Sequence, residues 1–327
     1  MTEVLSAETI LNALRMFFKD PIVSKTQFFK MGVENTTVLL VGNFGSVVLR
    51  VWGEQHSRMG KRQLGDIQDE LAFMEACRKA NLPVPKVHIS LDGRAFERLP
   101  EGRNFSVMDY VEGEEPSHFT KPMIEALAAA IATMNVLGET FEYPAPRSWQ
   151  GTIVDLARER LDEFHAKGIK DEFVERLAKQ MERQLAQIDL ASLPYGPIHG
   201  DVMYQNIKYA GERLSGIFDF DDCRESYFIE DITKALYFVI EDPEHCVLGN
   251  DINNAQTFLR AYEQVRALNE LERSALPALS TARFIYEMLK FYLHGANHPQ
   301  AAEILANKKA AYETFRPLFD PENATFI

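Results

Sequence analysis

The first third of the chain alternates short apolar runs with turns, a pattern typical of antiparallel strands. Strands are predicted over residues 27–30, 35–41, 46–52, 82–87 and 105–113, where apolar and β-branched residues cluster. Glycine-containing turns separate the first three strands, and Asp92-Gly93 predicts a later hairpin turn. One helix is expected over residues 64–80, because Ile67, Leu71 and Met74 recur at helical spacing. This part of the chain is therefore expected to form a small antiparallel sheet with one long helix.

The rest of the chain has apolar positions at helical spacing. Helices are predicted over residues 124–137, 153–166, 172–188, 229–240, 252–268, 270–293 and 300–315. Pro277 is expected to start or kink the sixth of them, and Ser6 is a candidate N-cap for a further helix over residues 6–18. A strand-rich first third before a helix-rich remainder predicts a two-lobed α+β enzyme. We place the domains at residues 1–110 and 111–327.

Composition narrows the classes of partner. The 327 residues exceed one typical domain, and an apolar fraction of 46% can fill two cores. A net charge of −13 argues against a nucleic-acid partner. We see no signal peptide, and the apolar run 126–137 is too short to span a bilayer. Three cysteines, at positions 77, 223 and 246, form no disulfide framework or zinc pattern. We expect a cytoplasmic protein without a membrane partner, and the oligomeric state stays open.

Residues 199–221 carry the most informative pattern of chemical groups. The segment reads His-Gly-Asp-Val-Met-Tyr-Gln-Asn from position 199, and Asp-Phe-Asp follows from position 219. Asp201 is expected to orient and deprotonate an attacking hydroxyl, while Asn206 and Asp219 hold Mg²⁺ on nucleotide phosphates. Their oxygen atoms are the hard ligands that Mg²⁺ requires. The alternative is a turn that is merely rich in Asp and Asn.

The local pattern around these residues supports phosphoryl transfer. Short strands are predicted over 207–209 and 214–218, joined by a turn at 210–212. Such a hairpin brings Asn206 and Asp219 to the same end, where both can reach one metal. Residues 195–197, Tyr-Gly-Pro, are expected to be a turn, and the basic run 58–62 a mobile loop.

The residues quoted above resemble the aminoglycoside phosphotransferase and choline kinase superfamily. Its catalytic loop reads H-G-D-x-x-x-x-N where protein kinases read H-R-D-x-x-x-x-N, and its metal motif is D-[FWL]-[DE]. The resemblance implies a two-lobed protein-kinase-like fold: a small antiparallel-sheet N-terminal lobe that binds ATP, and a larger, mostly helical lobe for catalysis and substrate. It also implies that Asp231 braces the catalytic loop. His199 is expected to be structural.

The resemblance implies nucleotide-binding residues in the first lobe. Arg50 stands where a kinase places its phosphate-binding lysine, and Glu70 would be its partner on the helix. The first turn would cover the phosphates, with Gly32 and Asn35 as its binding residues. The backbone groups of Asp109 and Val111 would bind adenine. The alternatives are a solvated Arg50–Glu70 pair and an ordinary hairpin.

The substrate is indicated less directly. The acidic residues Asp221, Asp222 and Glu225 begin a run that continues to Asp242, and they favour a substrate that carries an amine. The alternative is a solvated acidic face. Residues 32–36, 258–262, 266–268 and 283–284 resemble type II homoserine kinases, whereas the sequence Asp-Phe-Asp-Asp from 219 resembles stress-response kinases that act on protein Ser/Thr.

Three hypotheses about function follow from these patterns. The first is an ATP- and Mg²⁺-dependent kinase of a small aminated alcohol: homoserine-like, aminoglycoside-like or choline-like. The second is a protein Ser/Thr kinase, which the short segment 223–229 disfavours because a peptide substrate needs a longer activation segment. The third is a nucleotide-binding protein without catalysis. Only Arg50 suggests it, and the intact Asp201, Asn206 and Asp219 argue against it.

Overall fold

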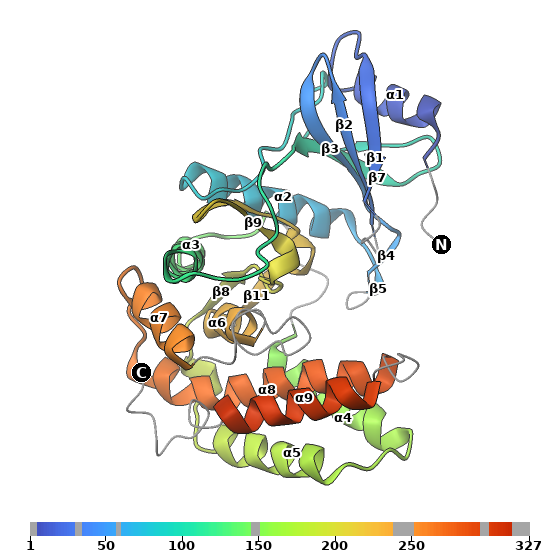
Figure 1. Cartoon of the computed structure of the whole chain (residues 1–327). Helices are drawn as coiled ribbons and strands as arrows, with labels where there is room; N and C mark the ends of the chain where they lie inside the picture. Colours follow the sequence, from blue (N-terminus) through green and yellow to red (C-terminus); the bar gives the residue numbers. More distant parts are fainter. Residues whose placement is uncertain are drawn as a thin grey trace. The chain divides into compact units, whose positions relative to one another are not determined.

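A computed structural model describes residues 5–29, 35–56, 60–144, 151–237, 252–294 and 301–315 (Figure 1). These residues divide into two compact units. Within the described ranges, the first unit comprises residues 5–112, 143–144 and 216–218, and the second comprises 113–142, 151–215 and the residues from 219 onward. The division into domains at residues 1–110 and 111–327 remains a prediction.

The first unit is built on a five-stranded antiparallel sheet with the order β1-β2-β3-β7-β6. Its strands are β1 (Val23–Phe28), β2 (Thr36–Gly42), β3 (Gly45–Val51), β6 (Glu97–Arg98) and β7 (Asn104–Asp109). A separate hairpin pairs β4 (Gln55–His56) with β5 (Gly60–Lys61). The expectation of a loop over residues 58–62 is therefore wrong at 60–61, because these residues pair with β4. Residues 57–59 lie outside the described ranges.

Helix α1 (Ala7–Arg15) packs on one face of this sheet (Figure 1). Ser6 caps the helix by accepting a hydrogen bond from the backbone of Thr9, as expected. The buried side chains of α1 share one core with alternate residues of β2, β3 and β7, among them Leu40 and Leu49. Side chains alternate between the faces of a strand. Arg50, next to Leu49, therefore points to the other face, where α2 (Leu64–Lys79) places Glu70.

The second unit is mainly helical. Its helices are α3 (Lys121–Gly138), α4 (Ile153–Ala166), α5 (Glu172–Leu185), α6 (Ile229–Leu236), α7 (Ile252–Glu263), α8 (Glu270–His294) and α9 (Ala301–Phe315). Helix α8 contacts α4, α5, α6 and α9, and α3 packs on α7 (Figure 1). Pro277 lies inside α8, so it does not begin the helix.

Two short strand pairs carry the loops of interest. Strand β9 (Ile207–Ala210) pairs with β10 (Arg213–Ile217), close to the expected hairpin, and β8 (Tyr195–Ile198) pairs with β11 (Arg224–Tyr227). The expected turn at 195–197 is therefore wrong, because those residues form β8. Neither β8, with its Gly-Pro, nor the polar β11 has a local strand pattern, so their pairing depends on tertiary context. Single 3₁₀ turns span Leu190–Ser192, Tyr204–Asn206 and Phe220–Asp222.

None of the helices in the described ranges is both long and apolar enough to cross a bilayer.

Candidate active site

The predicted catalytic loop connects β8 to β9, and the buried carboxylate of Asp231 holds its backbone in place. Asp231, on α6, accepts hydrogen bonds from the backbone N–H groups of His199 and Gly200 at 3.0 and 2.8 Å. Its side chain is fully buried, so these charge-assisted bonds fix the loop backbone strongly. The bracing role of Asp231 that the resemblance implied is therefore confirmed.

A polar chain behind Asp231 extends to two further helices. Asn135, on α3, donates from Nδ2 to Oδ2 of Asp231 at 3.3 Å. The hydroxyl of Tyr262, on α7, donates to Oδ1 of Asn135 at 2.8 Å. All three side chains are buried. Because each group has a hydrogen-bond partner, the network fixes the loop relative to α3 and α7.

Gly200 needs both its backbone conformation and its lack of a side chain. Its φ of +79° lies in the left-handed region, which favours glycine. A Cβ atom here would lie 2.4 Å from Nη1 of Arg224 and 2.5 Å from the carbonyl oxygen of Asp222. The glycine therefore lets the catalytic loop pack directly against the segment that follows Asp219.

Asp201 and Asn206 are brought together by the loop. Nδ2 of Asn206 donates to both the carbonyl oxygen and Oδ2 of Asp201, each at 2.9 Å. The backbone N–H of Asp201 donates to Nδ1 of His199 at 3.2 Å. The ring of His199 is fully buried, 4.4 Å from the ring centre of Phe220. These contacts support the expected structural role for His199 and leave the Asp201 side chain about 20% exposed.

The donor set suits a divalent cation of the magnesium type. Both hydrogen bonds of the Asn206 amide use Nδ2, which leaves Oδ1 as the side-chain atom that can coordinate a cation. Asp219 follows β10, with a φ of +63°, and begins the 3₁₀ turn Phe220–Asp222. Across the described residues, no group of three His, Cys, Asp or Glu side chains gathers at a metal-binding spacing. Mg²⁺ commonly takes only one or two protein carboxylates plus phosphate and water, so the residues fit.

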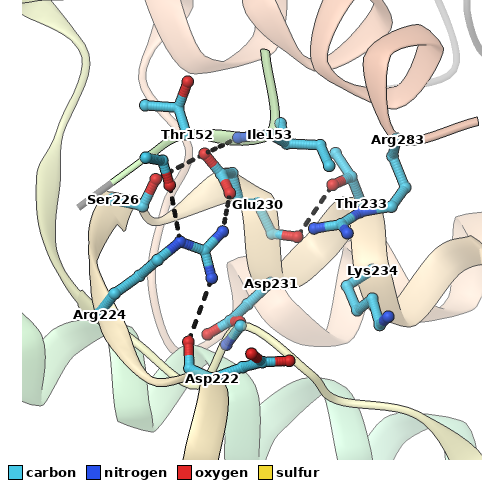
Figure 2. Close-up of polar contacts among 12 residues, drawn as sticks. Thr152, Ile153, Asp222, Arg224, Ser226, Glu230, Asp231, Thr233, Lys234 and Arg283 are labelled. Atoms are coloured by element: carbon cyan, nitrogen blue, oxygen red, sulfur yellow. Dashed lines mark hydrogen bonds and ion pairs between the residues drawn. The ribbon is translucent and has the colours of Figure 1, made fainter. Parts of the chain in front are cut away.

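The acidic run after Asp219 does not form one surface. Figure 2 shows Arg224 reaching between Glu230 and Asp222. Nη2 of Arg224 lies 2.6 Å from Oε2 of Glu230, and Nη1 donates to the carbonyl oxygen of Asp222 at 3.2 Å. Glu230 also accepts from the hydroxyl of Ser226 at 2.6 Å. The carboxylates of Glu230 and Asp231 are thus engaged inside the protein.

The three candidate substrate residues lie in different environments. Asp221 is buried within the 3₁₀ turn, whereas Asp222 and Glu225 are half-buried. Glu225 lies on β11, and its carbonyl oxygen accepts from the hydroxyl of Tyr195 at 3.0 Å. Glu241 and Asp242 lie outside the described residues. A role for Asp221, Asp222 and Glu225 in binding substrate remains a prediction.

In the first unit, Arg50 and Glu70 form a buried ion pair. Nη1 of Arg50 lies 2.6 Å from Oε1 of Glu70, with side-chain exposures of 6% and 1%. The indole N–H of Trp52 donates to Oε2 of Glu70 at 3.0 Å, and the guanidinium of Arg50 lies 5.6 Å from the centre of the indole ring. This burial excludes the alternative of a solvated surface pair. The role of the pair in binding phosphate remains a prediction.

The other candidate nucleotide residues give a mixed result. Oδ1 of Asn35 accepts from the backbone N–H of Gly53 at 3.1 Å, so this side chain braces the end of β3. The N–H of Asp109 donates to the carbonyl oxygen of Lys86 at 2.9 Å, which leaves its carbonyl group as the candidate contact for adenine. Val111 packs closely on Gly216. Gly32 lies outside the described residues. Nucleotide binding by these four residues stays a prediction.

Sequence reasoning missed several residues that the structure brings to the site. Arg224, Asn135 and Trp52 hold loop or ion-pair geometry, and Lys234 lies 2.8 Å from Oδ1 of Asp201. Lys234 stands among the apolar residues of helix Ile229–Leu236, all of which is buried, and a charged residue in such a stretch is a weak signal of a buried ion pair. Asn135 gave no signal, because Asp231 lies 96 positions away. Arg224 and Trp52 bond Glu230 and Glu70, six and 18 positions away, but no sequence pattern marks these pairs.

Comparison with known proteins assigns the chain to a family. The family model described as "Phosphotransferase enzyme family" matches residues 25–268, which include Arg50, Asp201 and Asp219. The chain belongs to the phosphotransferase enzyme family. It is therefore a kinase whose acceptor is a hydroxyl group.

Curated relatives of this phosphotransferase include two named homoserine kinases. The enzyme of Rhodopseudomonas palustris strain HaA2 is 27% identical over 300 residues, which cover 90% of this chain and 86% of the relative. The enzyme of Bradyrhizobium diazoefficiens is 27% identical over 292 residues, which cover 88% of this chain and 84% of the relative.

Solved structures show the same fold. The amicoumacin kinase hAmiN in complex with AMP-PNP, Ca²⁺ and Ami has a TM-score of 0.71 and 18% identity, and the match covers 98% of each chain. A microcompartment-associated aminopropanol kinase also has a TM-score of 0.71, with 19% identity, 98% of this chain and 100% of that chain covered. These matches confirm the expected kinase-like α+β fold of the aminoglycoside phosphotransferase type.

Proposed function

We propose that this phosphotransferase uses ATP and Mg²⁺ to phosphorylate the hydroxyl of a small amino alcohol, with homoserine as the first candidate. The observation that carries the chemistry is the contact of Asn206 with the Asp201 carboxylate in a loop fixed by Asp231. The substrate class is supported by the homoserine kinases, which match 90% and 88% of this chain, and by the fold shared with an aminopropanol kinase.

Asp201 is proposed to act on the substrate hydroxyl. Its carboxylate accepts the hydroxyl proton as the hydroxyl oxygen bonds to the γ-phosphorus and the bond from phosphorus to the bridging oxygen of ADP breaks. Such a transfer depends mainly on positioning and on stabilising charge. A carboxylate with one oxygen tied to Asn206 and the backbone tied to His199 is oriented before the substrate binds.

Each unit, taken by itself, carries candidate groups for the nucleotide. Oδ1 of Asn206 and the Asp219 carboxylate would coordinate a divalent cation, which neutralises charge on the phosphates when bound. Arg50 would contact phosphate oxygens with its planar guanidinium, which Glu70 and the indole of Trp52 hold in place. Adenine would meet the carbonyl of Asp109.

An amine on the substrate would be recognised by carboxylates beside the metal loop. Asp221, Asp222 and Glu225, which follow Asp219 in the chain, are the candidates. A desolvated carboxylate–ammonium pair discriminates strongly, because an analogue without the amine leaves a charge unpaired.

The two other hypotheses receive less support. Strand β11 begins at Arg224 and leads directly to α6 at Ile229, so this segment is paired structure and not an open platform for a peptide. A binding protein without catalysis has no need for the Asp201–Asn206 contact. Neither hypothesis is favoured by the homoserine kinase relatives.

The test is an ADP-release assay with purified protein, ATP and Mg²⁺ across a panel of acceptors. We expect turnover with homoserine or another amino alcohol, and little with its deaminated analogue. Asp201→Asn should lower kcat by about 10²-fold, the range for a positioned general base. Calorimetry should show that this variant keeps its MgATP affinity. Efficient turnover of a neutral sugar, or near-normal turnover by Asp201→Asn, would contradict the proposal.

A further inference from the structure

Lys234 is a buried lysine that contacts the proposed catalytic carboxylate. It lies on α6, and its side chain is 2% exposed. Its Nζ lies 2.8 Å from Oδ1 of Asp201 and 3.1 Å from Oε1 of Glu287, on α8. Burying an ammonium group costs several kcal/mol unless carboxylates and hydrogen bonds compensate it. Here the carboxylates of Asp201 and Glu287 compensate the buried ammonium of Lys234.

The contacts of Asp201 divide between its own loop and the helical frame. Oδ2 is tied to Asn206 and the backbone N–H to His199, and both partners belong to the same loop. The contact of Oδ1 with Lys234 links this carboxylate directly to a side chain of α6. Asp231 already ties the backbone of this loop to α6. The contact with Lys234 extends that fixation to the Asp201 carboxylate itself, where a misplacement of about 1 Å can cost 10²-fold in rate.

Glu287 completes the arrangement from α8. Burial by itself raises the pKa of Glu287, but the charges of Lys234, Lys290 and Arg283 outweigh it and hold that pKa well below its usual range. Glu287 is therefore ionised at neutral pH. It supplies Lys234 with a counter-charge that persists when Asp201 has accepted a proton from the substrate.

We propose that Lys234 is a positioning residue for phosphoryl transfer: its ammonium, oriented by Glu287, holds the Asp201 carboxylate in place for the substrate hydroxyl. This inference rests on the proposed role of Asp201. The competing account is that the Lys234–Glu287 pair only joins α6 to α8. The two accounts differ in what happens to kcat while the variant protein is fully folded.

The first experiment replaces Lys234 with Met, which keeps the length of the side chain and removes its charge. We expect kcat to fall by about 10²-fold, as for a misplaced catalytic group, with the KM for MgATP and the calorimetric MgATP affinity unchanged. Lys234→Arg should recover part of the kcat. Lys308→Met is the matched control, because Lys308 is also buried, on α9, and bonds the hydroxyl of Tyr237 at 2.8 Å. It should lose stability but keep kcat.

The second experiment separates the effect of Lys234 on the position of the Asp201 carboxylate from its effect on the stability of the fold. Lys234→Met leaves Glu287 with less counter-charge, so we expect a lower thermal midpoint. At temperatures low enough to keep this variant fully folded, as circular dichroism shows, kcat should stay low. A wild-type kcat at these temperatures would make Lys234 purely structural and overturn the inference. If Lys234→Met is active and Asp201→Asn is inactive, only this inference fails. If Asp201→Asn is fully active, the proposed role of Asp201 fails as well.

Discussion

The carboxylate of Asp231 offers a sharp test of how the catalytic loop is held. It accepts three hydrogen bonds, from the backbone N–H groups of His199 and Gly200 and from the amide of Asn135. Asp231→Asn keeps the shape of the side chain but leaves one acceptor oxygen. Its new NH₂ group must then face one of the three donors, and the charge that strengthened all three bonds is lost.

The expected cost follows from this count. One buried donor left without an acceptor, together with the lost charge assistance, should destabilise the second unit by about 2–4 kcal/mol. Gly200 directly precedes Asp201, so a shift of the loop displaces the proposed base. We therefore expect kcat to fall by about 10²-fold, the effect of a misplacement near 1 Å.

Urea unfolding followed by circular dichroism measures the first effect, and the ADP-release assay measures the second. Asp162→Asn is the control, because it makes the same chemical change at an exposed position on α4. It should change neither quantity. If Asp231→Asn unfolds at the wild-type urea concentration and keeps its kcat, the argument that this carboxylate holds the loop is refuted.

Three further predictions concern the metal, the nucleotide and a helix cap. Asp219→Ala should abolish Mg²⁺-dependent nucleotide binding in calorimetry; unchanged affinity would remove Asp219 as a ligand. Glu70→Gln should raise the KM for ATP and destabilise the first unit by about 3 kcal/mol, whereas Glu75→Gln, in an exposed pair with Arg78, should cost less than about 1 kcal/mol. Burial raises the pKa of Asp171, but hydrogen bonds from Lys309 and Tyr292 outweigh it and lower that pKa. The ionised Asp171 carboxylate therefore stabilises the fold at pH values above its unfolded pKa of about 3.9, and this stabilisation is lost as the pH falls through its folded pKa. The thermal midpoints of wild type and Asp171→Asn should differ at pH 7 and converge in acid.

The elements that the sequence predicts well are those with a strong local period. The helices at 64–80, 153–166 and 270–293 lie within a few residues of α2, α4 and α8, because their apolar positions repeat over several turns. Strands β8 and β11 were missed. Each is four residues long, and each is stabilised by the other across more than twenty intervening residues.

The site shows the same division between local and distant information. Asp201 and Asn206 were recognisable because they lie five positions apart in a loop of known type, and their contact is local. Lys234 and Glu287 lie 53 positions apart, and the contact depends on how α6 packs on α8. No single-residue pattern reports such packing. The acidic run was also not separable by sequence alone: Arg224 and the loop backbone take up the carboxylates of Glu230 and Asp231, whereas a substrate role for Asp221, Asp222 and Glu225 stays a prediction.

The close contact at Gly200 also constrains how this sequence can change. Protein kinases carry an arginine immediately before the catalytic aspartate, whereas here a guanidinium reaches the same neighbourhood from Arg224 on β11. A side chain at position 200 would collide with that guanidinium and with the carbonyl of Asp222. The two positions should therefore vary together among relatives, with glycine at 200 wherever an arginine occupies 224. Gly200→Arg would give this loop the protein-kinase sequence at that position, but the collision means that this chain cannot accept it as a single substitution.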